Sequence, residues 1–414
     1  MRIPPAMLHR RFVLLWAGMF FSVAGSNMQT AALLWHIRTL TSQPIALGGI
    51  GLARILPVFF FSLIGGALAD TVNRRKLMFL TQVSLAILAL ILGFLTLTGR
   101  INLWYIYVLT ALQAVASSFD LPARQALVPN LVPPRDLSSA FSMNSMAFQA
   151  GAIIGPALSG LVIAYWGLQY VYLINAASFL TVLAALVAIG SVPQQVQPGR
   201  PKVSRQSIRE GIQFIRNSPI ILSTMLVDFT ATFFSSANIL LPIITRDVLK
   251  AGAVTYGWLS AAQSIGAVTA ALVISQLQGI RRQGMVFLSA VVIFGLATIG
   301  FGLASSVVAA MVALIFIGAA DSVSTIIRNT IRQLQTPDQM RGRMTGVNQI
   351  FFMGGPQLGE VEAGLVAQFF TAPIAVISGG VGCILAVLWV VRKWPHLSRY
   401  NGDEPVAAGN IPAA

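Results

Sequence analysis

The sequence predicts an all-α integral membrane protein with twelve transmembrane helices in two six-helix bundles that repeat one another. Three observations support this fold class. Of the 414 residues, 56% are hydrophobic and only 9% are charged, whereas a soluble globular protein carries about 25% charge. Mean hydropathy is +0.77. Twelve apolar stretches each approach or exceed the roughly 20 residues that cross a bilayer core, and polar landmarks of the first half recur in the second.

The apolar stretches define the order of the elements. They lie near residues 12–34, 47–69, 77–97, 101–121, 139–164, 168–190, 219–244, 256–276, 284–304, 306–327, 344–370 and 372–391. The expected domains are an N-terminal bundle (1–190), a linker with an amphipathic helix (191–218), a C-terminal bundle (219–394) and a disordered tail (395–414). Twelve spans place both termini on the same side of the membrane.

The distribution of the bases predicts which side that is. The net charge is +15, from 27 bases and 12 acids. If the termini are cytoplasmic, the far side holds only four bases, namely Arg38, Arg100, Arg246 and Lys250. Positive charge collects on the cytoplasmic side of membrane proteins. We therefore expect a multi-pass protein of the cell inner membrane with cytoplasmic termini. The charge records topology and needs no nucleic-acid partner, although the basic face could also hold anionic lipid.

The longest connection, 191–218, changes from proline-rich to helical character. Ser207 and Glu210 have the spacing of a capping box, and Ile208, Ile212 and Ile215 share one helical face. This pattern predicts an interfacial helix that joins the two halves. A solvated charged linker is the alternative.

The loop between the second and third spans carries a recognisable pattern. Gly66 and Asp70 end an apolar helix, and Arg74 and Arg75 follow directly. The spacing Gly-x-x-x-Asp-x-x-x-Arg-Arg resembles the loop signature of the major facilitator superfamily. The resemblance implies close helix packing at Gly66, a helix-end contact at Asp70 and a cytoplasmic clamp at the two arginines. Asn73 stands where the family has glycine, and we expect it to adopt the left-handed turn. A simple topology signal is the alternative for the bases.

The two halves of the chain share landmarks at offsets near 200 residues. Asp120, Arg124, Pro134, Gly155-Pro156 and Gly160 correspond to Asp321, Arg328, Pro337, Gly355-Pro356 and Gly364. A shared period indicates duplication. Parallel repeats of this kind place a binding site between them near the middle of the membrane.

The fifth span carries small residues at helical spacing around a proline. Gly151, Gly155 and Gly160 let a neighbouring backbone approach, and Pro156 bends the helix. We expect this segment to act as a packing hinge. Its pattern also resembles the signature of exporters in the superfamily, which implies efflux. Packing alone is the alternative.

Further segments resemble one efflux branch, the group of the enterobactin exporter and macrolide efflux proteins. They are Leu121 to Pro129, Leu240-Leu241-Pro242, Leu334 to Pro337 and Arg341-Gly342-Arg343. Span four departs from many drug/proton antiporters, because Thr110 and Ala114 flank Gln113 where those proteins carry an arginine and a glycine. The proton scheme built on that arginine is therefore not carried over.

Ionisable residues inside hydrocarbon are functional candidates because burying each charge is costly. Asp228, near the middle of span seven, is the first candidate for proton coupling, with a neutral hydrogen-bonded aspartic acid as the alternative. Arg54 pairs with Asp228 or a bound anion, or else extends to the outer surface. Glu360 is the second coupling candidate. Acids two apart on a helix face different directions, so at most one of Glu360 and Glu362 faces the cavity, and the repeat position favours Glu360. Two acid and base sets at the cytoplasmic ends of spans four and ten are expected to be gate latches, with substrate contacts as the alternative: Asp120 with Arg124, and Asp321 with Arg328.

Amide side chains and aromatic rings could line a central cavity. The polar candidates, with Arg54, are Asn27, Gln29, Gln113, Asn238 and Gln263. The aromatic candidates are Trp16, Phe233, Phe234, Phe351 and Phe352, although most such rings face lipid or other helices. His36 is expected in an aromatic belt at the outer interface.

The sequence contains no motif for ATP hydrolysis, metal binding or enzymatic catalysis. The chain has no Walker loop for ATP, one cysteine, Cys383, and three dispersed histidines. We expect no metal, no cofactor and no enzymatic activity.

The sequence thus predicts a monomeric secondary transporter that exports an organic small molecule, a siderophore or an amphipathic drug, against proton entry. A lysophospholipid flippase and a proton-driven importer are alternatives within transporters. A membrane sensor or secretion accessory that transports nothing is the alternative from another class.

Overall fold

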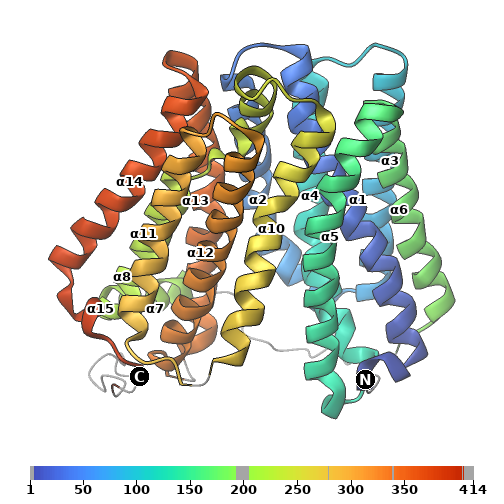
Figure 1. Ribbon diagram of the computed structural model, residues 1–414. Coiled ribbons are helices and arrows are strands. Elements are labelled where there is room, and N and C mark those ends of the chain that lie inside the picture. Colours follow the sequence, from blue (N-terminus) through green and yellow to red (C-terminus); the bar gives the residue numbers. More distant parts are fainter. Residues whose placement is uncertain (1–3, 193–204, 278, 338–339, 403, 405–414) are drawn as a thin grey trace. The chain divides into compact units, whose positions relative to one another are not determined.

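The computed structural model describes residues 4–192, 205–277, 279–337, 340–402 and 404 (Figure 1). These residues form helices and connecting turns, with no strand among them. The long helices of the first half are α1 (Arg10–Leu40), α2 (Ile45–Thr71), α3 (Arg74–Leu97), α4 (Leu103–Leu127), α5 (Leu137–Tyr165) and α6 (Leu168–Ile189). Short 3-10 turns are η1 (Pro5–Leu8), η2 (Val128–Asn130) and η3 (Pro134–Asp136).

The second half begins with α7 (Arg205–Arg216) and continues with five further long helices and one broken one. The broken helix is α8 (Pro219–Phe234) followed by η4 (Ala237–Leu240), α9 (Leu241–Ile243) and the π-helical turn η5 (Ile244–Val248). The others are α10 (Ala253–Gln276), α11 (Gln283–Gly302), α12 (Val307–Leu334), α13 (Arg341–Phe369) and α14 (Ala372–Lys393). A short helix, α15 (Pro395–Arg399), comes last.

The expected spans agree with these helices. Within the described residues, nine helical segments have the length and apolar composition to cross a membrane. The other three expected spans correspond to α1, α2 and α13. The protein is therefore an all-helical, multi-pass membrane protein.

Side chains at the turns explain where several helices begin. The Asn73 side chain accepts a hydrogen bond from the Lys76 backbone N–H at 3.1 Å and so caps α3. Asn102 caps α4 in the same way, through the Tyr105 N–H at 2.9 Å. Asn73 has a φ of −64°. The expected left-handed turn is therefore wrong, because the residue acts as an N-cap, for which asparagine is equally suited.

The chain divides into two compact units. Unit 1 comprises residues 1–42, 52–200 and 251–261, and unit 2 comprises 43–51, 201–250 and 262–414. In unit 1, α1 packs on α5 and α6, and α3 packs on α4 and α6. In unit 2, α8 packs on α13 and α14, and α11 packs on α12 and α14. The two packing schemes are the same after a shift of six spans, as the repeated landmarks predict.

Each unit also contains the beginning of one helix that otherwise belongs to the other. The start of α10 packs in unit 1, where a Cβ atom added at Gly160 would lie 2.9 Å from the Cα of Gly257. The start of α2 packs in unit 2, where a Cβ added at Gly364 would lie 2.9 Å from the Cα of Gly48. Both contacts need glycine, because a larger residue would separate the two backbones.

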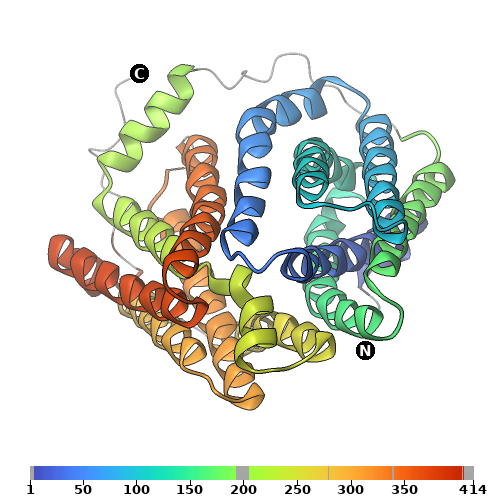
Figure 2. The ribbon, with the colours of Figure 1, turned by 90° about the horizontal axis from the view of Figure 1, so that it is seen from above.

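The helix α7 lies against α13 and α8 in unit 2. Figure 2 shows α7, in light green, lengthwise. It begins at Arg205, so the expected cap at Ser207 falls inside the helix. The buried side chains are Phe214 and Ile215, whereas Ile212 is 51% exposed. The helix turns Gly211 and Phe214 toward its partners, and the interfacial face expected for Ile208, Ile212 and Ile215 stays a prediction.

The C-terminal segment differs from expectation between residues 395 and 402. Pro395–Arg399 is helical, and Leu397 and Tyr400 are buried. The expected disorder of this stretch is wrong because two apolar side chains fix it to unit 2. Residues 405–414 lie outside the described residues.

Candidate functional site

A buried charge cluster joins α8 to α12 in unit 2. Asp228 of α8 accepts a hydrogen bond from Arg328 of α12, and its second oxygen lies 3.6 Å from Nη2 of Arg332. All three side chains are 2% or 3% exposed. We call Asp228, Arg328 and Arg332 the charge cluster. Replacing such a buried ion pair with packed apolar residues is often neutral or stabilising. Its presence in a membrane protein therefore points to function.

Two further groups surround the charge cluster. Nε of Arg332 donates to the Thr224 hydroxyl at 3.3 Å. Asp321, seven residues before Arg328 on α12, is near enough to interact electrostatically with both Arg328 and Asp228. Asp228 and Asp321 thus both interact with the Arg328 guanidinium group. Within the described residues, the terminal nitrogens of Arg332 make no hydrogen bond, so this guanidinium has donors available for another acceptor.

The sequence identified Asp228, Asp321 and Arg328 but not their arrangement. It paired Arg328 with Asp321, whereas the structure gives Arg328 an ion pair with Asp228, one hundred residues away. It suggested Arg54 as a partner for Asp228, but the ion pairs of Asp228 within unit 2 are with Arg328 and Arg332. Sequence reasoning missed Arg332, although its four-residue spacing from Arg328 places the two on one helical face.

Unit 1 has a related polar cluster on α4, the helix that corresponds to α12. Asp120 and Arg124 form an ion pair at 2.5 Å along α4. The other carboxylate oxygen of Asp120 accepts hydrogen bonds from Thr81 and Gln82 of α3, both at 2.9 Å. The pair named from the sequence is present in this case, and it connects α4 to α3.

The loop arginines bind backbone carbonyls inside unit 1. Arg74 donates to the Ala126 carbonyl and the Asn130 side chain, both at 3.0 Å. Arg75 donates to the Leu186 carbonyl at 2.7 Å. These bonds tie the start of α3 to the ends of α4 and α6. Gly66 and Asp70 belong to α2, and the surroundings of their side chains lie outside what the structure describes.

The small residues of α5 face two different helices. Cβ atoms added at Gly151 and Gly155 would lie 2.8 Å from Val23 and 2.6 Å from the Ala24 carbonyl of α1. Gly160 instead faces Gly257 of α10. Pro156 lies between these contacts. In the segment expected to act as a hinge, Gly151 and Gly155 thus pack on α1, and Gly160 packs on α10.

The amides expected in a cavity are bound to one another. Gln29 donates to Gln113 at 2.9 Å, and Asn175 donates to Gln29 at 2.7 Å. Asn238 donates to Gln263 at 2.6 Å, while Asn27 donates to the Val23 carbonyl of its own helix. Sequence reasoning missed Asn175, which connects α6 to α1.

The structure also describes four other residues singled out in the sequence. Glu360 is half-buried on α13. It lies close to the start of α2, because a Cβ added at Gly51 would be 3.0 Å from the Cβ of Glu360. Glu362 and Arg54 are also half-buried. His36 is only 3% exposed, and its Nδ1 lies 2.9 Å from the Tyr172 hydroxyl. The expected belt position of His36 is therefore wrong, because the ring points into unit 1.

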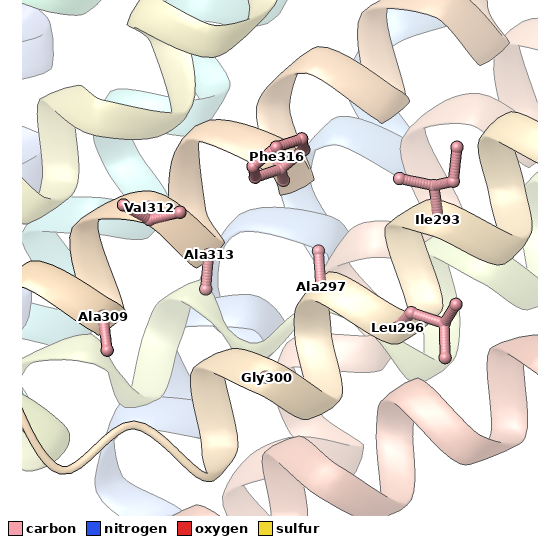
Figure 3. A pocket seen from close by; sticks show the side chains of 8 residues that line it. All are labelled: Ile293, Leu296, Ala297, Gly300, Ala309, Val312, Ala313 and Phe316. Atoms are coloured by element: carbon pink, nitrogen blue, oxygen red, sulfur yellow. The ribbon is translucent and has the colours of Figure 1, made fainter.

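An apolar groove of about 520 Å³ lies between α11 and α12 (Figure 3). Its lining residues are Ile293, Leu296, Ala297, Gly300, Ala309, Val312, Ala313 and Phe316. None of these side chains is polar, so the groove offers nothing to orient a polar substrate. The charge cluster remains the candidate functional site.

Comparison with known proteins places these features in context. The chain matches the family described as transmembrane secretion effector over residues 5–403. It is 25% identical to the enterobactin exporter EntS of Citrobacter koseri over 401 residues, which is 97% of this chain and 96% of that protein. The EntS of Escherichia coli O1:K1 is also 25% identical, over 400 residues that cover 96% of this chain and 95% of that one.

Solved structures of major facilitator transporters share the fold. A bacterial homologue of the human lysosomal transporter Spinster, inward-facing and unoccupied, has a TM-score of 0.72 at 14% identity, covering 96% of this chain and 97% of its own. A bacterial homologue of the iron transporter ferroportin, inward-facing, has a TM-score of 0.69 at 16% identity, covering 94% and 99%. At these identities the likeness establishes the fold.

Proposed function

Because the chain belongs to the transmembrane secretion effector family of the major facilitator superfamily, we propose that it is a secondary transporter that exports an organic small molecule by proton antiport. The superfamily assignment makes it a membrane transporter. The direction, the proton coupling and the cargo are our proposal. The buried charge cluster is the observation that carries the proposal.

Charge arithmetic explains how the charge cluster can couple to a proton. When Asp228 is ionised, it compensates Arg328 and Arg332 across two helices. When its carboxyl group takes a proton, the charge compensation ends and two buried guanidinium groups lose their partner. Asp321 is then the remaining carboxylate that interacts electrostatically with Arg328. Proton binding therefore favours a different arrangement of α8 against α12, which is the two-state element that coupling requires.

Glycine contacts mark where helices can separate during the conformational change. Gly160 with Gly257, and Gly48 with Gly364, bring helices together without side chains between them. Such contacts can part and re-form with little repacking. We propose that they close one gate, and that the Asp120–Arg124 pair and the Arg74 and Arg75 bonds stabilise the opposite one.

The proposed cargo is a siderophore or an amphipathic drug. The named relatives are enterobactin exporters, and the chain covers nearly their full length. The exporter-like pattern of Gly151 to Gly160 in α5 supports the same direction. We also propose cytoplasmic termini and a monomer as the working unit, with no ATP, metal or cofactor.

The test is transport by purified protein in vesicles with an imposed proton gradient. Enterobactin and an amphipathic dye serve as probes. We expect proton-dependent movement of at least one probe, and its loss in Asp228→Asn. Asp136→Asn is the control, because Asp136 is an acid bound to His9 at 2.8 Å outside the charge cluster. Coupled transport that survives in Asp228→Asn would remove the charge cluster from the mechanism.

A further inference from the structure

The end of unit 2 where α8 begins and α14 finishes carries a surface that the transport proposal does not use. Four bases lie within eight residues there, namely Arg392, Lys393, His396 and Arg399, and all are exposed. Two tryptophans, Trp389 and Trp394, accompany them. We propose that this surface, the α14–α15 foot, binds an anionic phospholipid through its head group.

The aromatic rings place the α14–α15 foot at the membrane interface. The Lys393 ammonium lies 4.9 Å from the ring centre of Trp389 and 4.8 Å from that of Trp394. The two rings meet edge to face at 5.5 Å. Tryptophan concentrates where hydrocarbon meets head groups, and α14 is a spanning helix that ends at Lys393. The bases are therefore held at the depth of lipid phosphates.

The segment after α14 is attached at a fixed position. Leu397 is fully buried and Tyr400 is 1% exposed. The Tyr400 carbonyl accepts a hydrogen bond from the Gly284 N–H at 3.0 Å. Gln335 donates to the Tyr400 hydroxyl at 3.2 Å. A side chain at position 284 would overlap the Leu397 carbonyl, so the docking depends on glycine there.

A cavity beside the docked segment has the composition of a head-group site. It has a volume of about 300 Å³ and is lined by Pro219, Ile220, His396, Arg399, Tyr400 and Glu404. Pro219, Ile220 and the Tyr400 ring give the lining its apolar part, and His396 and Arg399 give it two bases. The single acid, Glu404, accepts hydrogen bonds from the backbone N–H groups of Asn401 and Gly402 at 2.9 and 3.1 Å. These two N–H groups partly compensate its negative charge.

The chemistry favours a lipid over a soluble anion. A phosphate would meet Arg399 and His396, while the adjoining glycerol and acyl chains would meet Ile220 and the tryptophans. A base at an anionic membrane surface contributes about a five-fold gain in binding. A free phosphate would gain nothing from the apolar side of the cavity.

Native mass spectrometry of the full chain, with phosphatidylglycerol and phosphatidylcholine supplied in equal amounts, tests the proposal. We expect the protein to retain phosphatidylglycerol preferentially. The double variant Lys393→Gln, Arg399→Gln should reduce that preference by about ten-fold or more, because two bases are lost. The matched control Arg100→Gln, Lys250→Gln removes two exposed bases elsewhere and should leave it unchanged. Equal losses in both double variants would mean that only general charge attraction operates, and would overturn the site.

A second variant separates the built site from charge alone. Gly284→Ala displaces the docked segment without changing any charge and should also reduce phosphatidylglycerol retention. Gly300→Ala is its control, since a Cβ at Gly300 meets no atom within 4 Å. Thermal unfolding in lipid-free detergent verifies that each variant is folded. If glycerol phosphate competes as well as the lipid does, or if Gly284→Ala retains the lipid fully, the proposal is wrong.

Discussion

At the residue scale, the charge cluster shows why a buried acid cannot be interpreted from its own neighbours in sequence. Asp228 has apolar residues on both sides in the sequence, yet the structure pairs it with Arg328 and Arg332 of α12. Its proposed role therefore depends on those two bases as much as on the acid. Removing one member of such a set leaves an uncompensated charge, which costs more than removing both.

This imbalance gives the first prediction. Arg328→Gln alone should destabilise the protein by about 3 kcal/mol or more, because Asp228 loses its direct partner. The double variant Asp228→Asn, Arg328→Gln should recover a large part of that loss while remaining inactive in coupled transport. Detergent-titrated unfolding and vesicle transport measure the two effects. Additive losses of stability would show that the two side chains do not interact.

A second prediction at this scale concerns the cap of α3. Asn73→Ala should reduce the free energy of unfolding by about 1 kcal/mol, because the Lys76 N–H loses its acceptor. Asn73→Ser keeps a side-chain oxygen and should retain most of the stability. If alanine and serine behave alike, the cap is not what stabilises this helix start.

At the element scale, the contacts between glycines determine how closely helices approach. Gly257 of α10 lies against Gly160 of α5, and a Cβ added at Gly257 would lie 2.8 Å from the Gly160 Cα. The sequence showed the small residues of the fifth span, but it did not show that Gly257 of α10 packs against them. A leucine at Gly257 should force the two backbones apart and hinder closure there.

The third prediction follows from this contact. Gly257→Leu should reduce the transport rate by about ten-fold or more while leaving the protein in the membrane, since overpacking costs about 1–3 kcal/mol. Gly300→Leu adds the same side chain at a position where a Cβ meets no atom within 4 Å and which lines the α11–α12 groove, so this variant should transport normally. Vesicle transport at matched protein amounts makes the comparison. A normal rate in Gly257→Leu would show that closure does not use this contact.

At the scale of the whole molecule, two units with one packing scheme explain the expected topology. Each half of the chain supplies six of the twelve expected spans, so we expect the chain to end on the side where it began. Most bases fall on that side, which is the cytoplasmic one in our proposal. The position of the termini can be tested with introduced cysteines, because Cys383 is the single native cysteine and is buried.

The fourth prediction is the accessibility pattern of single cysteines in a Cys383→Ser background. Cysteines at Ser398 and at Asn73 should react with a membrane-impermeant reagent only after the membrane is opened. A cysteine at Arg100 should react in intact cells. Labelling of position 398 in intact cells would contradict cytoplasmic termini.

The sequence by itself determined the class of the protein, because membrane crossing depends on local composition. Runs of about 20 apolar residues, the uneven distribution of bases and the repeated Gly355-Pro356 landmark are all local signals. They led to the fold, to the Asp120–Arg124 pair four residues apart, and to Asp228 as a candidate.

Only the tertiary structure decided which distant groups meet. It joined Asp228 to Arg328 and Arg332, turned His36 toward Tyr172, and docked Leu397 and Tyr400 where the sequence predicted disorder. The physical reason is common to all three. Helix spacing fixes neighbours three and four residues apart, whereas pairing between helices depends on how whole helices pack, and no local pattern records that.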